Sequence, residues 1–334
     1  MVSICDIARE AEVSVTTVSR VLANKSASIE TRRKVLRAVE KFGYVPDARA
    51  SSLKSRKTKS VGLIIPDISN PVYPVTVKVT HDIAKVRGYH LILGNTYGRL
   101  DEEMEILKMM LRERVAGLIL GICEGEDDTS CNSYLNKIIN SGVSVVLTGR
   151  NRNGLQVDEI TTDNKKGAYK ATNYLLKIGR KRIGFMAGRR GLLATDARLA
   201  GYLQAFSEKR VGQNEKLLSF GDWTRVSGQK QMRSLLNSGE KPDAVFCAND
   251  LLAIGAMETI KKAGLKIPDD IAVVGFDDIE LSSLVQPRLT TVNQPQEKIA
   301  EIACNLLLDR IERNESEEPK EILLEPELII RESA

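Results

Sequence analysis

The sequence predicts an N-terminal all-α unit with a helix-turn-helix arrangement, followed by an α/β body of two doubly wound parallel-sheet subdomains. Residues 1–45 carry apolar side chains at helical spacing, interrupted by short polar turns. From Val61 onward, apolar runs alternate with amphipathic segments of helical length. This alternation is typical of parallel sheets that are covered by helices on both faces.

Three short helices are predicted in the first 45 residues. Ser3 and Asp6 form an S-x-x-D capping signal for the first helix, and Ser14 and Ser28 are favourable N-caps for the next two. Gly43 is a typical helix-ending residue. A helix, a turn of a few residues and a second helix together make the helix-turn-helix pattern.

Nine apolar runs are predicted as strands of the body. Polar residues near 150–163 mark a break, so we expect two sheets rather than one. In doubly wound folds ligands bind at the carboxyl ends of the strands, and two such subdomains facing each other form a cleft. The nine runs are residues 61–66, 91–95, 117–121, 143–149, 158–163, 182–188, 216–221, 244–250 and 271–278.

Positive charge is concentrated at the N-terminus. Residues 1–60 contain 13 Lys and Arg against 6 Asp and Glu, a net charge of +7, whereas the remaining residues contain 36 against 38, a net charge of −2. A compact basic unit on a near-neutral body indicates a polyanionic partner such as DNA. The alternative is an ordinary solvated charged surface.

Several classes of protein are disfavoured. No apolar run approaches the ~20 residues of a membrane span, and the charged N-terminus does not resemble a signal peptide, so we expect a cytoplasmic protein without membrane contact. Five scattered cysteines and only two histidines favour neither a disulfide framework nor a metal site. Nucleophile-elbow, dinucleotide and phosphate-loop motifs are missing from the sequence. We therefore expect no enzyme, no cofactor and no metal.

Short, recognisable motifs are distributed along nearly the whole chain. The motifs of the N-terminal unit and the VVGFDD segment are highly specific, whereas the others are weak when taken singly. Up to residue 71 they are Asp6-Ile7-Ala8, Val13-Ser14, Thr17-Val18-Ser19-Arg20-Val21-Leu22, Tyr44-Val45-Pro46, Ser52-Leu53-Lys54, Val61-Gly62-Leu63-Ile64, Pro66-Asp67-Ile68 and Asn70-Pro71. In the body they are Asp163-Asn164, Gly167-Ala168, Arg182-Ile183, Arg198-Leu199-Ala200-Gly201-Tyr202, Ala248-Asn249-Asp250, Ala253-Ile254-Gly255-Ala256, Val273-Val274-Gly275-Phe276-Asp277-Asp278 and Leu289-Thr290-Thr291-Val292. Together these motifs resemble the lactose/galactose repressor (LacI/GalR) family of bacterial transcription regulators.

The resemblance implies a sequence-specific DNA-binding repressor that acts as a homodimer on a palindromic operator in double-stranded DNA. It also implies a small-molecule effector, a sugar or sugar derivative, bound between two body subdomains similar to those of periplasmic sugar-binding proteins, in which the chain crosses three times. The implied parts are residues 1–46 (DNA-binding headpiece), 47–59 (hinge), 60–160 with 292–320 (N-terminal effector subdomain) and 161–291 with 321–334 (C-terminal effector subdomain).

The second helix of the headpiece is expected to enter the major groove, where its N-terminal residues meet base edges. By the resemblance, Val15, Thr16 and Arg20 read bases, since Arg bonds both acceptors of a guanine and Val or a Thr methyl contacts a thymine methyl. The alternatives are that Val15 packs in the core and that Arg20 pairs with a local Glu. Phosphate contacts are expected from Thr17, Ser19 and Asn24.

The hinge contains one large apolar residue, Leu53, among five positive charges at residues 49–59. In the family this leucine is a lever that enters the minor groove from two adjacent hinge helices, unstacking a base step. Ala50 lets those helices approach closely. A helix this short is unstable alone in water, so its folding is expected to depend on DNA. The alternative is that Leu53 packs against the body.

The effector cleft is expected at the strand ends of the body. By the resemblance Arg198 and Asp277 bond the ligand, Asn249 is a further strand-end match, and Tyr73 and Trp223 sandwich a flat ligand or the apolar face of a sugar. The alternatives are that Trp223 belongs to the core and that Asp277 caps the next helix. Four arginines lie in loops just after predicted strands, which is consistent with an anionic effector. The simpler explanation is that they are solvated surface residues. They are Arg150, Arg152, Arg189 and Arg190.

Three questions stay open at this point. Glu12 occupies the helix-turn-helix turn, where Gly or Asn is usual, so either the turn is less left-handed or stability is lost there, by roughly 1 kcal/mol.

The protein is alternatively a global regulator controlled by a protein corepressor or, less favoured, a sugar-binding protein without a transcriptional role. One apolar stripe is expected mostly in the core and partly against a second subunit: Val72, Val75, Val79, Ile83 and Val86.

Overall fold

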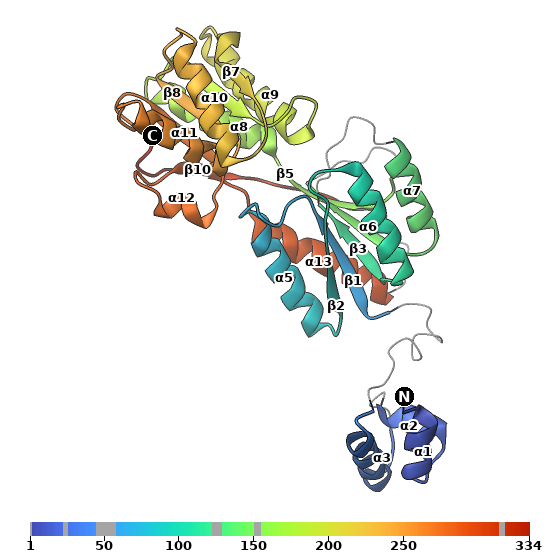
Figure 1. The fold of residues 1–334 in the computed structure, drawn as a ribbon. Helices are drawn as coiled ribbons and strands as arrows, with labels where there is room; N and C mark the ends of the chain where they lie inside the picture. Colours follow the sequence, from blue (N-terminus) through green and yellow to red (C-terminus); the bar gives the residue numbers. More distant parts are fainter. Residues whose placement is uncertain (1, 23–25, 45–57, 122–128, 150–154, 314–317) are drawn as a thin grey trace. The chain divides into compact units, whose positions relative to one another are not determined.

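The computed structural model describes residues 2–22, 26–44, 58–121, 129–149, 155–313 and 318–334. It divides into two compact units, Met1–Thr58 and Lys59–Ala334 (Figure 1). Among the described helices, none is long and apolar enough to cross a membrane.

The first unit is a three-helix cluster of α1 (Ile4–Glu10), α2 (Val15–Leu22) and α3 (Ile29–Phe42). Its small core is built from one apolar stripe on each helix, including the fully buried Ile7, Val18 and Val35. Every expected cap is confirmed. The Ser3 and Asp6 pair forms a capping box, Ser28 accepts a hydrogen bond from the Thr31 backbone N–H, and Gly43 ends α3 at φ 56°.

Glu12 takes a left-handed backbone conformation, with φ 54°. The turn between α1 and α2 is therefore as left-handed as a helix-turn-helix turn with glycine, and the glutamate costs stability there, by roughly 1 kcal/mol. Ser14 begins the next helix, because its Oγ accepts a 3.1 Å hydrogen bond from the Thr17 backbone N–H.

The second unit contains two six-stranded sheets. The first has the strand order β11-β5-β4-β3-β1-β2 and is parallel throughout. The second has the order β12-β10-β9-β8-β6-β7, in which only β12 runs antiparallel to its neighbour. The strands are β1 (Ser60–Ile65), β2 (His90–Asn95), β3 (Gly117–Leu120), β4 (Ser144–Thr148), β5 (Asp158–Thr162), β6 (Ile183–Ala187), β7 (Leu218–Phe220), β8 (Ala244–Cys247), β9 (Ala272–Asp277), β10 (Thr290–Asn293), β11 (Glu321–Leu324) and β12 (Glu327–Ile329).

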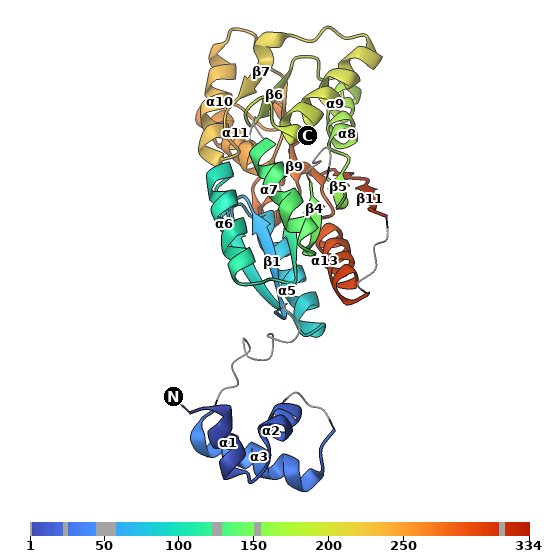
Figure 2. The ribbon, with the colours of Figure 1, turned by 90° about the vertical axis from the view of Figure 1, so that its right-hand side faces the viewer.

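Helices cover both faces of each sheet (Figure 2), as the alternating pattern predicts. On the first sheet, α5 (Tyr73–Val86) and α13 (Gln296–Arg313) pack on one face, and α6 (Leu100–Arg112) and α7 (Thr129–Asn140) on the other. On the second sheet the pairs are α8 (Asn164–Lys177) with α9 (Leu193–Lys209), and α10 (Arg225–Asn237) with α11 (Asp250–Lys262). A short 3₁₀ turn, Glu215–Leu217, precedes β7, and the short α12 (Glu280–Leu284) follows β9.

The chain crosses between the two sheets three times, at residues 162–164, 293–296 and 324–327. Two of these crossovers differ from the expected boundaries. β10, which ends at Asn293, belongs to the second sheet, and β11 belongs to the first, where it pairs with β5. The shift at the third crossover arises because β11 and β12 are short, half-exposed strands separated only by Glu325 and Pro326. In the sequence the two strands therefore look like one continuous segment.

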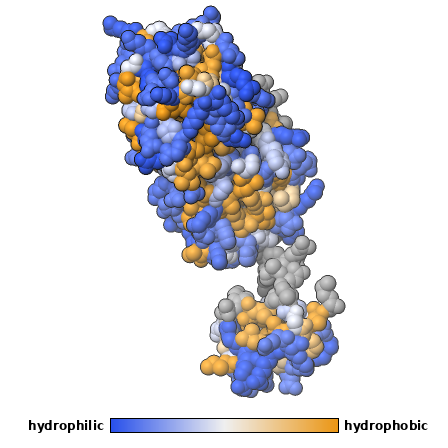
Figure 3. All heavy atoms as spheres, turned by 60° about the vertical axis from the view of Figure 1, so that its left-hand side comes forward, coloured by the Kyte–Doolittle hydropathy of each residue, from blue (hydrophilic) through white to orange (hydrophobic). Residues whose placement is uncertain are grey.

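The apolar stripe of α5 is split between core and surface. Val72 is buried and Ile83 packs against the core of the first sheet, whereas Val86 is 87% exposed. Leu93 on the edge strand β2 and Leu284 on α12 are also exposed, at 39% and 65%. Figure 3 shows that apolar atoms gather into patches on one face of the molecule.

Candidate functional site

The outward face of α2 carries the residues expected to read DNA bases. Val15, Thr16 and Arg20 are all exposed, and Val15, at 41%, is not the core residue that the alternative required. Arg20 donates a 3.0 Å hydrogen bond to the backbone carbonyl of Ser26 instead of pairing with a glutamate. Its guanidinium is therefore held near the end of α2.

The residues expected at phosphates and in the hinge are only partly within the described chain. Thr17 is half-buried and its hydroxyl lies 2.8 Å from that of Ser14, whereas Ser19 is exposed. Asn24, Ala50 and Leu53 lie outside the described residues.

The second unit contains a cavity of about 500 Å³. Residues of both subdomains and of the crossovers line it, among them Tyr73 at the start of α5, Arg198 in α9 and Gln294 after β10. The cavity lies at the carboxyl ends of strands such as β5 and β9, where doubly wound folds bind ligands. Four predicted effector residues, Arg198, Trp223, Asn249 and Asp277, line it together with Tyr73, whereas Arg150 lies outside the described residues.

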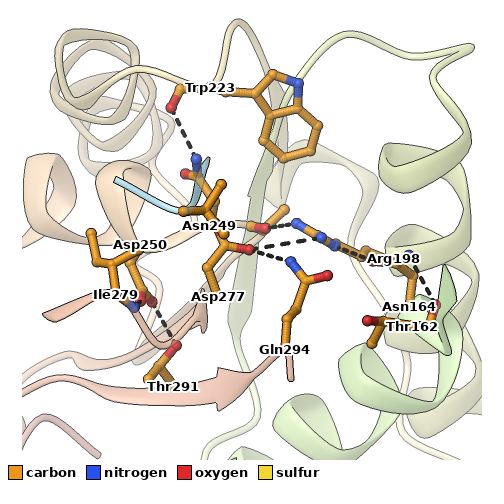
Figure 4. A network of polar contacts seen from close by, with 12 residues as sticks. Thr162, Asn164, Arg198, Trp223, Asn249, Asp250, Asp277, Ile279, Thr291 and Gln294 are labelled. Carbon is orange, nitrogen blue, oxygen red and sulfur yellow. Dashed lines mark hydrogen bonds and ion pairs between the residues drawn. The ribbon is translucent and has the colours of Figure 1, made fainter. Parts of the chain in front are cut away.

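A buried ion pair lies at the centre of this wall (Figure 4). Arg198 Nη2 is 3.9 Å from Asp277 Oδ1, and the two side chains are only 6% and 7% exposed. Arg198 also donates from Nε to Asn164 Oδ1 at 2.8 Å and from Nη1 to the backbone carbonyl of Ala248. Asp277 Oδ1 accepts a 2.6 Å hydrogen bond from the Gln294 amide. The pair is therefore fixed by groups on two crossovers.

Aromatic rings enclose the Arg198 guanidinium. Its central carbon lies 3.8 Å from the Phe276 ring centroid and 5.6 Å from that of Trp223, within the range of cation–π attraction. Trp223 packs directly on the backbone of Gly188, where a Cβ would be only 2.4 Å from the indole. Trp223 thus contacts the core with one part and lines the cavity with another.

Asn249 and Asp250 connect the cavity wall to the start of α11. Asn249 caps that helix by accepting a 2.9 Å hydrogen bond from the Leu252 N–H, and it donates to the Trp223 carbonyl at 3.0 Å. The fully buried Asp250 accepts from the Ile279 N–H at 2.9 Å and from the Thr291 hydroxyl. These bonds fix the loop that follows Asp277.

Asp277 and Asp278 point in different directions, as adjacent residues at a strand end do. Asp277 faces Gln294, whereas Asp278 pairs with Arg331 at 2.6 Å. The alternative that Asp277 caps the following helix is wrong, because α12 has Ile279 at its N-cap and no side-chain capping bond. Burial raises the pKa of Asp277 to about 6, while Arg198 and Gln294 act in the opposite direction.

Three members of this network were missed by sequence reasoning: Asn164, Gln294 and Asp250. Asn164 directly follows the predicted strand 158–163 and Asp250 is the last residue of the predicted strand 244–250, so a search for polar residues at strand ends finds these two as candidates. Gln294 follows β10, which was not among the predicted strands. Arg189 also lines the cavity. The guanidinium carbon of Arg190 instead lies 4.5 Å from the centroid of the Phe220 ring.

Comparison with known proteins identifies the two units. Residues 3–47 match the family described as bacterial regulatory proteins, lacI family, and residues 172–334 match the periplasmic binding protein-like domain. The HTH-type transcriptional repressor PurR of Proteus mirabilis is 36% identical over 100% of this chain and 97% of its own length. The chain belongs to the LacI family. Its function as a DNA-binding transcription repressor follows from this membership, and the sequence prediction of family and fold is confirmed.

Solved structures of transcription regulators have the same fold. The transcriptional regulator CelR in complex with cellobiose is 31% identical, with a TM-score of 0.75 and full coverage of both chains. The lac repressor dimer bound to operator and the anti-inducer ONPF is 26% identical, with a TM-score of 0.87 over 99% of this chain and 98% of the other.

Proposed function

We propose that this LacI-family repressor binds a palindromic operator as a homodimer and that a small molecule in the body cavity controls the binding. The observation that carries the proposal is the Arg198–Asp277 pair, which contacts side chains of two crossovers, Asn164 and Gln294. A ligand bonded to this pair changes the contacts of segments that join the two subdomains. The residues that bind the effector are therefore also the residues that contact the crossovers between the subdomains.

Operator recognition is assigned to the exposed face of α2. Val15, Thr16 and Arg20 read bases in the major groove, because their side chains are exposed on the helix that the family places there. Two hinge residues, Ala50 and Leu53, contact the minor groove. Phosphate contacts come from Thr17, Ser19 and Asn24. Because DNA is its target, the repressor acts in the cytoplasm.

The effector is a sugar or sugar derivative held by the cavity wall. Arg198, Asn249 and Asp277 offer donors and acceptors for hydroxyl groups, and the Tyr73 and Trp223 rings offer apolar surfaces. Arg150 completes this set as proposed from the sequence. The solved structure of CelR, which matches this chain over its full length, is that of a complex with the sugar cellobiose.

A protein corepressor is the weaker candidate for control. A regulator governed by another protein has no need of a cavity with aromatic rings and a buried ion pair, and both are present here. A sugar-binding role without DNA leaves the basic headpiece unexplained.

The homodimer is supported by exposed apolar side chains on both subdomains. Val86 and Leu93 belong to the first subdomain and Leu284 to the second, and each is a large apolar group in contact with solvent. Burial of such groups against a second copy is favourable, at ~25 cal/mol per Å² of apolar surface.

Selection from random DNA duplexes tests the proposal. The purified full-length repressor is expected to enrich a palindromic site, and a panel of neutral sugars, sugar phosphates and purines is expected to contain a compound that changes the recovery of that site. Failure to prefer any duplex, with or without the panel, would reject the function. Enrichment that responds only to a cell extract protein would favour the corepressor instead.

A further inference from the structure

Two threonine hydroxyls in the cavity wall are buried and have no hydrogen-bond partner among the described residues. Thr76 and Thr162 are only 6% and 4% exposed, and both line the cavity. Within the described part of the chain, neither hydroxyl oxygen forms a hydrogen bond. A buried hydroxyl without a partner is unfavourable by comparison with a bonded or solvated one, so its presence in a native protein calls for an explanation.

Both threonines belong to the first subdomain. Thr76 lies in α5, and Thr162 is the last residue of β5, where the first crossover begins. The backbone carbonyl of Thr162 accepts a 3.2 Å hydrogen bond from Asn164, the residue that holds Arg198, while its hydroxyl has no partner in the part of the chain that the structure describes. Figure 4 shows Thr162 beside Asn164 in this network.

We propose that Thr76 and Thr162 bind hydroxyl groups of a polyhydroxylated effector. They hold it from the first subdomain, while Arg198 and Asp277 hold the same molecule from the second. The inference rests on the proposed function, in which this cavity is the effector site. A threonine hydroxyl is both a donor and an acceptor, as a sugar hydroxyl is, so the two can pair in either direction.

The same arrangement makes the site selective. A buried group that is built to bond a ligand hydroxyl rejects the analogue that lacks it, because the group is then left unpaired. The two threonines are therefore expected to distinguish a sugar from its deoxy analogue, which a purely apolar wall does only weakly.

The chain provides matched control residues. Thr80 lies one turn beyond Thr76 on α5, and Thr172 lies in α8. Both are fully buried with hydroxyls that have no partner among the described residues, and neither lines the cavity. Thr→Val at any of the four positions removes an unpaired hydroxyl at nearly constant size. None of these variants is expected to lower the thermal midpoint of the free protein.

The experiment measures binding of defined sugars to the full-length protein. Ribose, glucose, cellobiose, 2-deoxyribose and 2-deoxyglucose are titrated by calorimetry and by the fluorescence of Trp223, the only tryptophan in the sequence. For the sugar that binds, Thr76→Val and Thr162→Val are each expected to weaken binding about 3- to 10-fold, the effect of one neutral hydrogen bond. Thr80→Val and Thr172→Val leave the affinity unchanged.

The other outcomes separate this inference from the proposed function. If Asp277→Asn weakens binding but the valines at positions 76 and 162 do not, the threonine contacts are refuted and the effector site stands. If a sugar binds with an affinity that neither Asp277→Asn nor the valine variants change, the effector site itself is misplaced. Binding of none of the sugars overturns the polyhydroxylated class. A lower midpoint for Thr162→Val shows a hydrogen bond within the protein and also overturns the inference.

Discussion

The Gln294 amide donates a 2.6 Å hydrogen bond to Asp277 Oδ1 and thereby joins the second crossover to the end of β9. The same oxygen lies 3.9 Å from Arg198, which is bonded in turn to Asn164 at the first crossover. Two of the three crossovers are thus linked through one buried ion pair. An effector that bonds to this pair competes with both links.

Asp277→Asn is expected to stabilise the protein at neutral pH. Burial raises the pKa of Asp277 from 3.8 to about 6, so between these values the folded state binds more protons than the unfolded state. The free energy of unfolding therefore falls as pH rises through this window, and the loss persists above it. The neutral asparagine is expected to raise the free energy of unfolding at pH 7.5 by up to about 3 kcal/mol.

Urea denaturation of both proteins between pH 4.5 and 8 checks this prediction. The difference should shrink toward the acid end, where Asp277 is protonated. A variant that is less stable than the parent at pH 7.5 would show that the Arg198 contact outweighs the cost of burying the carboxylate.

Arg20→Ala is expected to relax base choice at one operator position. A bidentate Arg–guanine contact contributes roughly 1–3 kcal/mol of discrimination, whereas a phosphate contact is blind to sequence. Lys57→Ala, in the basic hinge sequence, is expected to weaken all duplexes alike and to reduce the salt dependence of binding. Competition binding with single-base operator variants measures both effects. The opposite pattern would place base reading outside α2.

Gly201→Ala is expected to destabilise the second subdomain. A Cβ at Gly201 would lie 2.0 Å from the backbone oxygen of Lys165, so α8 and α9 must move apart at a cost of roughly 1–3 kcal/mol. Gly212 is the control, because a Cβ there has no neighbour within 4 Å and its φ is not in the left-handed range. Chemical denaturation of the two variants compares them. Equal stability would mean that the helix pair adjusts freely.

Val86→Asp and Leu284→Asp are each expected to weaken the proposed homodimer. Both side chains are largely exposed in the single chain, at 87% and 65%, and burying a carboxylate against a second copy is unfavourable. Sedimentation velocity should show a shift toward monomer, with a parallel loss of operator affinity. Ile178→Asp, at a side chain that is 42% exposed at the end of α8, is the control substitution. A dimer unaffected by both charges would place the subunit contact elsewhere.

Elements set by local chemistry could be predicted from the sequence. The caps at Ser3, Ser28 and Gly43 are formed by residues within a few positions of one another, and the apolar strands follow from their composition. The left-handed backbone at Glu12 could be named only as one of two outcomes, because tertiary packing decides whether a turn accepts a cost of this size.

The details of the site depend on contacts between distant segments. Gln294 meets Asp277 only because the second crossover passes the end of β9, and no local pattern marks that encounter. The pairing of β11 with the first sheet was likewise missed, since strand partners lie far away in the sequence. An unbonded hydroxyl such as that of Thr162 has no sequence signature at all.

The route of the chain has a consequence for its synthesis. One face of the first sheet is covered partly by α13, whose Ile299, Ala303 and Leu307 pack on strands made from residue 60 onward. The ribosome must therefore synthesise β6 to β10 of the second subdomain before the first subdomain is complete. Until then the nascent chain exposes an apolar face of the first sheet. Transiently exposed surfaces of this kind are where aggregation begins and chaperones bind.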